Sequence, residues 1–150
     1  MGQLVLPNTG LIYMDASPII YSVEKIEPYS SLLQPLWLAA QAGNLRLLGS
    51  ELLLLETLVK PIQNQDHILE ATFRQLLTAS RELHLVPIGT DVLEQAIHLR
   101  STTGLKTPDA IHAATALISG CTLFVTNDSG FRRVAGLTVI VLQEVLTASN

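Results

Sequence analysis

The chain has 150 residues, of which 48% are hydrophobic, and its formal net charge is −4. That length fits one domain, predicted to span residues 1–150, whose core needs no disulfide or structural metal. A single cysteine, Cys121, excludes a disulfide framework and a thiolate zinc cluster. No apolar run is long enough to cross a membrane, and residues 1–6 carry neither a secretory nor a myristoylation signal. We therefore expect a cytoplasmic protein without membrane contact.

The first half of the chain alternates short apolar runs with helical patterns. In chain order it predicts a strand at 10–15, helices at 18–25 and around 32–40, a strand at 45–48 and a helix at 50–59. Ser17 before Pro18 is typical of a helix N-cap followed by proline at the first helical position. Gly43 is expected to end the second helical run. Ser50 is expected to cap the third helix and Pro61 to end it.

The second half continues the same alternation. It predicts a helix at 65–82, a strand at 83–88, helices at 91–100 and 108–118, strands at 122–126 and 137–142, and room for a short C-terminal helix. Thr107 is expected to cap the helix at 108–118, with Pro108 at its first position. Gly130 and Phe131 are expected in a loop. Strands separated by helices predict βαβ units, and hence an α/β fold whose mostly parallel sheet is flanked by helices.

Four carboxylates stand at marked places in this pattern: Asp15, Glu56, Asp109 and Asp128. Asp15 and Asp128 follow predicted strands, and Asp109 opens a predicted helix. Ligands of open parallel sheets collect outside the carboxyl ends of the strands, so acids at these positions can converge. Glu56 lies in a run of leucines, where an unpaired charge would be costly to bury.

Each acid also has a structural explanation. Aspartates often form turns and caps at strand ends, which fits Asp15 and Asp128 taken singly. The helix dipole favours Asp109 in a first turn, and Lys60 can pair with Glu56 at i+4. However, the junctions contain no phosphate-binding loop, dinucleotide glycine pattern or nucleophile elbow. Oxygen ligands suit Mg²⁺ or Mn²⁺, and four acids can hold one or two such ions.

Taken together, these residues resemble the PIN-domain ribonucleases, and within them the VapC-type toxins of type II toxin-antitoxin pairs. The resemblance runs from about residue 11 to residue 142 and rests on four segments, at residues 13–17, 50–56, 104–114 and 124–131. It implies a three-layer α/β/α, Rossmann-like fold. It also implies that Asp15, Glu56, Asp109 and Asp128 bind the metal, Mg²⁺ or Mn²⁺, with Ser17, Thr126 and Asn127 as polar supports.

The resemblance implies a metal-dependent endoribonuclease that hydrolyses RNA and is held inactive by a cognate antitoxin. It further suggests a homodimer and a groove that accepts an antitoxin segment. The sequence adds an expected apolar surface within residues 21–48, formed by Leu32, Leu33, Leu36, Trp37 and Leu38. A general-base role for His112 and phosphate contacts by Arg132 and Arg133 are further candidates.

Three alternatives stay open at this point. A phosphatase of another α/β family would use Asp15 as a nucleophile, but it would need a second acid where this chain has Ser17. A stand-alone PIN-fold nuclease could process RNA or act on DNA, although the chain has little room for the long basic insertions of such enzymes. A non-catalytic module that binds nucleic acid or protein would tolerate loss of the acids, and none is lost.

Overall fold

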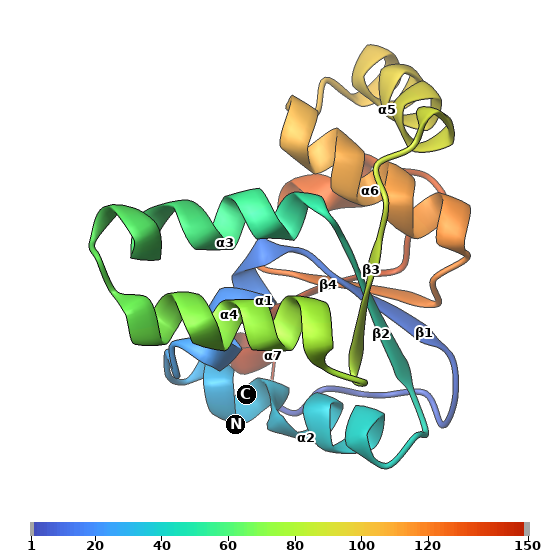
Figure 1. Ribbon diagram of the computed structural model, residues 1–150. Helices are drawn as coiled ribbons and strands as arrows, with labels where there is room; N and C mark the ends of the chain where they lie inside the picture. Colours follow the sequence, from blue (N-terminus) through green and yellow to red (C-terminus); the bar gives the residue numbers. More distant parts are fainter. Residues whose placement is uncertain (1, 149–150) are drawn as a thin grey trace.

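The structure, a computed structural model, describes residues 2–148 and is shown in Figure 1. Met1, Ser149 and Asn150, which the predicted domain 1–150 includes, lie outside the described residues. The strands of this range are β1 (Leu11–Met14), β2 (Arg46–Ser50), β3 (Leu83–Val86), β4 (Leu123–Thr126) and β5 (Val139–Val141). The helices are α1 (Ala16–Val23), α2 (Tyr29–Gln41), α3 (Leu52–Gln63), α4 (His67–Ala79), α5 (Thr90–Thr103), α6 (Thr107–Ser119), the 3₁₀ helix η1 (Ser129–Arg133) and α7 (Leu142–Thr147).

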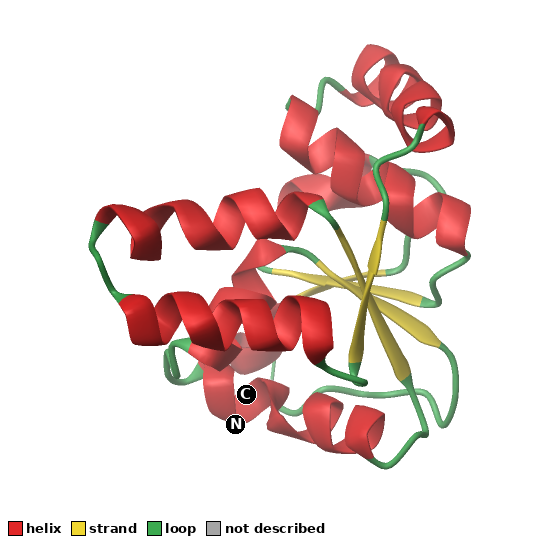
Figure 2. Ribbon diagram, in the orientation of Figure 1, coloured by secondary structure: helices red, strands yellow, loops and turns green. Residues whose placement is uncertain are grey.

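The five strands form one sheet in the order β3-β2-β1-β4-β5, and every pairing is parallel. Figure 2 shows the strands as a twisted fan between helices. The chain first moves from β1 outward to β2 and β3, and it later returns to the other side of β1 for β4 and β5. The strand order therefore reverses between β1 and β4, which is where open α/β sheets bind their ligands.

Helices cover both faces of the sheet, which confirms the predicted three-layer architecture. Successive side chains of β1 point to opposite faces, so Ile12 and Met14 join one hydrophobic cluster and Tyr13 joins the other. The first cluster draws on α1, α2, α3, α4 and α7, and the second on α5, α6 and η1. In Figure 1, α5 and α6 lie together on one side of the fan. Because both faces of the sheet are covered, its central strands consist mainly of apolar residues.

Several predicted helix starts differ from the structure by one to three residues, and Ser50, predicted to cap a helix, instead ends β2, so that Glu51 precedes α3. The first helix begins at Ala16, so Asp15 and not Ser17 occupies the N-cap position, and its side chain does not cap the helix. Helix α6 begins at Thr107, which leaves Lys106 as the N-cap residue. Proline is tolerated anywhere in a first turn because those N–H groups lack intrahelical partners, so its position marks a helix start only approximately.

Several predicted helix ends also differ from the structure. Pro61 does not end α3, which runs to Gln63, because a proline in the last turn removes few backbone hydrogen bonds. The helix after it ends at Ala79, not at 82, whereas α5 extends to Thr103 and is ended by Gly104 in the left-handed conformation, at φ 73°. The expected loop around residues 130–131 is part of η1.

The apolar surface predicted for residues 21–48 is largely absent. Leu32, Leu33 and Leu36 are buried in the first cluster, because α2 turns its apolar side toward the sheet. Trp37 is half-buried and its Nε1 donates to Ser22 Oγ at 2.8 Å. Of the five residues predicted for this surface, only Leu38 is well exposed. Within residues 2–148, no helix combines the length and apolarity needed to span a bilayer.

Candidate functional site

The acids singled out in the sequence lie at or near the reversal of the strand order. Asp15 directly follows β1 and Asp128 follows β4, whose strands pair with each other. Asp109 is the third residue of α6, and Glu56 is the fifth residue of α3. Both helices have contacts with each other, so two loops and two helix starts contribute to one region.

Asp15 is the most buried of these acids, with only 7% of its surface exposed. Its Oδ2 accepts a hydrogen bond from Thr126 Oγ1 at 2.5 Å, while its Oδ1 is buried without any partner in the described part of the chain. The pKa of Asp15 is raised to about 7, chiefly by burial, with smaller contributions from Glu56 and Asp109 and against the lowering effects of His112 and Thr126. A buried carboxylate oxygen without a partner is costly, so the folded protein gains from a proton or a cation at this oxygen.

The carboxylates act on one another electrostatically. Burial raises the pKa of Asp109, and Asp128 and Glu56 raise it further, while His112 and Lys106 oppose the rise. Together with the effects of Glu56 and Asp109 on Asp15, this connects all four acids by mutual repulsion. The region therefore favours a positive charge among the four carboxylates.

Glu56 pairs with a partner that differs from the one expected by helical spacing. Its Oε1 lies 2.6 Å from Nε2 of His112, whereas no ion pair with Lys60 is present among residues 2–148. The opposite ring nitrogen of His112, Nδ1, lies 2.6 Å from the hydroxyl of Tyr13. The i+4 explanation of Glu56 is therefore wrong, and His112 is held from both sides.

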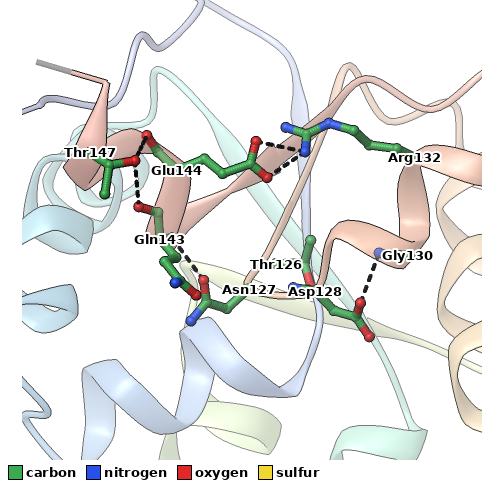
Figure 3. Close-up of polar contacts among 8 residues, drawn as sticks. All are labelled: Thr126, Asn127, Asp128, Gly130, Arg132, Gln143, Glu144 and Thr147. Carbon is green, nitrogen blue, oxygen red and sulfur yellow. Dashed lines mark hydrogen bonds and ion pairs between the residues drawn. The ribbon is translucent and has the colours of Figure 1, made fainter.

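The end of β4 orders its neighbours through three consecutive polar residues. Thr126 Oγ1 also accepts from the backbone N–H of Asp128 at 3.1 Å, and Asp128 Oδ1 accepts from the backbone N–H of Gly130 at 2.8 Å. Asn127 Oδ1 accepts from the backbone N–H of Gln143, as Figure 3 shows, and its Nδ2 donates to the Tyr21 hydroxyl. Thr126 thus orients Asp15, whereas Asn127 connects the end of β4 to α1 and α7.

The other candidates from the sequence, Ser17, Arg132 and Arg133, make no hydrogen bond or ion pair with the four acids in the described residues. The Ser17 side chain makes no hydrogen bond within the described residues, although it lies only two residues beyond Asp15. Arg132 pairs with Glu144 on the surface (Figure 3), so its charge is already compensated in this structure. Arg133 donates from Nε to the Gly130 carbonyl at 3.1 Å and from Nη1 to the Thr103 carbonyl at 3.0 Å.

The donor set fits a hard cation only in part. In the described range, no three His, Cys, Asp or Glu side chains are arranged to bind one ion directly. However, Mg²⁺ commonly takes only one or two carboxylates and completes its shell with water and substrate oxygens. The partnerless oxygen of Asp15, surrounded by other carboxylates, agrees with that mode of binding.

Sequence reasoning missed Tyr13, which lies two residues before Asp15 on β1. Its burial raises its pKa well above the ordinary value of 10.0, with Asp15 and Glu56 adding to the effect. The sequence contained one signal of this role. Tyr13 is the only residue with a polar side-chain group in the strand Leu11–Met14. A phenol buried in a central strand needs a partner, and that partner is His112.

The strand order and the carboxylates beyond β1 and β4 define an α/β protein with an acidic site at the reversal of its sheet. The model of the PIN domain family matches residues 12–137. The chain therefore belongs to the PIN domain family, which confirms the resemblance seen in the sequence. No curated protein sequence matches it.

Solved structures with the same fold include VapC-type proteins. A chain of VapBC2 from Rickettsia felis, bound to a DNA fragment from its promoter, has a TM-score of 0.71 at 17% identity, covering 87% of this chain and 97% of that one. VapC20 from Mycobacterium tuberculosis, described as a toxin that cleaves the sarcin-ricin loop, has a TM-score of 0.68 at 18% identity, with 85% and 96% covered. A toxin-antitoxin complex from Klebsiella pneumoniae has a TM-score of 0.66 at 20% identity, with 87% and 97% covered.

Proposed function

We propose that this protein is a metal-dependent endoribonuclease and the toxin of a toxin-antitoxin pair. The observation that carries the proposal is the Asp15 carboxylate, which is buried at the reversal of the sheet with one oxygen unpartnered and with three other acids acting on it or its neighbours. Such a group is stabilised by a cation. Membership of the PIN family and the fold shared with VapC-type toxins support the same function.

Asp15, Glu56, Asp109 and Asp128 are the residues that would hold Mg²⁺ or Mn²⁺. When bound, such an ion lowers the pKa of water and neutralises charge on a phosphodiester. Thr126 keeps Asp15 Oδ2 occupied, so Oδ1 is the oxygen left for the ion. Asp109 and Asp128 raise the negative charge on the side of α6 and β4, where a substrate phosphate could approach only with a cation present.

RNA is the proposed substrate despite the net charge of −4. Basic side chains lie around the loop between α5 and α6: the guanidinium of Arg133 is bound to the Thr103 carbonyl, and that of Arg100 donates to the Leu105 carbonyl at 3.0 Å. Lys106 is close enough to Asp109 to oppose the rise in its pKa that burial causes. Lys106 is thus the basic residue that acts on the acids, and we expect it, with Arg100 and Arg133 of the same loop region, to contact the phosphate backbone of a bound RNA. The solved relative that cleaves the sarcin-ricin loop favours RNA over DNA.

An antitoxin segment is the proposed occupant of a groove between α1, α2 and α4, whose lining includes none of the four acids. The groove has a volume of about 1090 Å³ and is lined by α1, α2 and α4, including Trp37, Ile68 and Leu76. Ile68 is 83% exposed, which is unusual for a large aliphatic side chain on a helix. Long apolar grooves between helices accept amphipathic helices of partner proteins. The Klebsiella structure is itself a toxin-antitoxin complex.

A homodimer is proposed through the outer face of α3. Leu55, Val59 and Ile62 are exposed by 64%, 45% and 49%, and their spacing places them in one stripe. The opposite side of the same helix is buried through Leu53 and Leu58. An apolar stripe on the outside of a helix is typical of an interface.

The nuclease proposal is tested with purified protein on labelled RNA and on DNA of the same sequence, in Mg²⁺, in Mn²⁺ and in EDTA. We expect cleavage of RNA that EDTA abolishes and that Asp15→Asn lowers by at least about 100-fold, as for loss of a catalytic electrostatic group. Asp91→Asn is the matched control, because Asp91 lies in the first turn of α5 on the surface. Cleavage that persists in EDTA, or cleavage of DNA alone, would overturn the proposal.

A further inference from the structure

We propose that His112 is a positioning residue for the Glu56 carboxylate and that Tyr13 fixes the imidazole ring that holds it. The inference rests on the proposed function, since it assigns a role at the same site. The hydrogen bonds Tyr13 to His112 and His112 to Glu56, each 2.6 Å long, form one continuous chain. Its members come from β1, α6 and α3, the elements that also carry or adjoin Asp15, Asp109 and Glu56.

The donors and acceptors of this chain have a definite direction. A carboxylate only accepts hydrogen bonds, so the proton between His112 and Glu56 belongs to Nε2 of the ring. In the neutral ring with Nε2–H, Nδ1 carries no proton and accepts the hydrogen bond from the Tyr13 hydroxyl. With a second proton on Nδ1, the ring would donate to the Tyr13 oxygen, so only the direction of that hydrogen bond would change. In either protonation state Nε2–H donates to Glu56.

The ring of His112 is held rigidly by its neighbours, whereas the Glu56 carboxylate is held only by His112 within the described residues. His112 is 2% exposed and meets Tyr13 edge-on, with ring centroids 5.7 Å apart, and Tyr13 is stacked on Phe124 at 5.0 Å. The Glu56 side chain is 26% exposed, and no other hydrogen bond in the described residues restrains it. Among residues 2–148, the buried imidazole of His112 therefore makes the only hydrogen bond to this carboxylate, and it leaves Oε2 for water or a cation.

Without His112, the Glu56 side chain would be free to rotate toward solvent or toward Lys60, four residues along α3. The expected cost appears in metal binding, since loss of a group that orients a ligand typically lowers metal affinity by about 10- to 100-fold. If His112 only packed in the core, its substitution would lower the stability of the fold, and the effect would not depend on Glu56. The two roles therefore differ in whether the effect of His112 depends on Glu56.

The test measures Mn²⁺ affinity of the whole chain by calorimetry, without substrate. We expect affinity to fall by about 10- to 100-fold in His112→Leu. A smaller loss is expected in His112→Gln, whose amide can still donate to Glu56. Tyr13→Phe keeps the aromatic stacking and removes only the hydroxyl. It therefore tests the series of hydrogen bonds from Tyr13 to Glu56 even if His112→Leu fails to fold. His98→Gln and Tyr29→Phe are matched controls, because His98 is exposed on α5 and the Tyr29 ring stacks on Tyr21 and takes no part in the hydrogen bonds to His112.

The decisive comparison uses Glu56→Gln as the background. If His112 acts through Glu56, the further change His112→Leu should alter Mn²⁺ affinity little in Glu56→Gln; independent roles would give additive losses. ¹⁵N NMR of the metal-free protein should show Nε2 of His112 as the protonated nitrogen. Unchanged affinity in His112→Leu and Tyr13→Phe, additive losses, or a bare Nε2 would overturn the inference while leaving the nuclease intact. A wild type without Mn²⁺ affinity would overturn the proposed function and this inference together.

Discussion

At the scale of single residues, the surroundings of each carboxylate decide its behaviour. Asp15 and Asp128 both follow strands, yet Asp15 is buried with one oxygen bound to Thr126, whereas Asp128 is exposed and accepts from the Gly130 N–H. The pKa of Asp15 is raised to about 7, chiefly because burial penalises its charge. Identical side chains in equivalent sequence positions therefore have different surroundings and different hydrogen-bond partners.

The raised pKa of Asp15 makes the metal-free protein less stable as the pH rises. Its folded pKa is about 7 and its ordinary value is 3.8, so between these pH values the folded state binds more protons than the unfolded chain. The free energy of unfolding should fall across that window by at most about 4 kcal/mol, at about 1.4 kcal/mol for each pH unit. Urea unfolding in EDTA across this range measures the slope. Asp15→Asn should lose this component and Asp91→Asn should keep it; equal slopes would contradict the assignment.

At the scale of elements, α3 serves two sides of the molecule. Its inner side packs through Leu53 and Leu58, and its outer side presents Leu55, Val59 and Ile62. Glu56 lies between these sides, next to α6. One helix therefore connects the core, the acidic site and the proposed dimer surface.

A charge in the outer stripe of α3 should break the dimer and leave the fold intact. Leu55→Glu replaces an exposed leucine, so the monomer loses little buried area, whereas an apolar interface would have to bury the charge. Sedimentation at micromolar concentration should show a dimer for the wild type and mainly monomer for the variant. Gln34→Glu, at an exposed position of α2 and so outside α3, is the control. A wild type that sediments as a monomer would contradict the proposed interface.

At the scale of the whole molecule, the acidic site and the groove between α1, α2 and α4 are separate. The groove is lined by residues of these helices and contains none of the four acids. A partner bound there would not need to contact the proposed metal ligands. Substitutions in the groove and at the acids should therefore affect different measurements.

Ile68→Asp should weaken antitoxin binding and spare RNA cleavage. Ile68 lines the groove from α4 with most of its surface exposed. Binding of an apolar partner would have to desolvate a carboxylate at this position, at a cost of at least about 3 kcal/mol. Co-purification with the product of an adjacent antitoxin-like reading frame, followed by calorimetry, measures the loss. Val5→Asp, another exposed aliphatic residue, lies outside this groove and serves as control. Undiminished binding by Ile68→Asp would place the partner elsewhere.

Mn²⁺ should raise the thermal stability of the wild type, because an ion that binds only the folded state stabilises it by mass action. At a concentration about 100-fold above Kd the gain is about 2.7 kcal/mol. Asp109→Asn should shrink this gain and, by removing one of the repelling charges, stabilise the metal-free protein at neutral pH. Thermal unfolding with and without Mn²⁺ gives both values. A melting temperature that millimolar Mn²⁺ leaves unchanged would argue against the metal site.

The sequence by itself determined the α/β class, the order of the main elements and the places of the four acids, because apolar periodicity and the residues at strand ends are local properties. Helix boundaries near Ser17, Pro61 and Thr107 were not predictable to the residue, since several positions of a terminal turn accept the same residue types. Only the tertiary structure decided that Glu56 pairs with His112 and not Lys60, and that the Tyr13 hydroxyl bonds the other ring nitrogen of His112. Tyr13 and His112 are 99 residues apart, and contacts of that kind depend on how the sheet and helices pack.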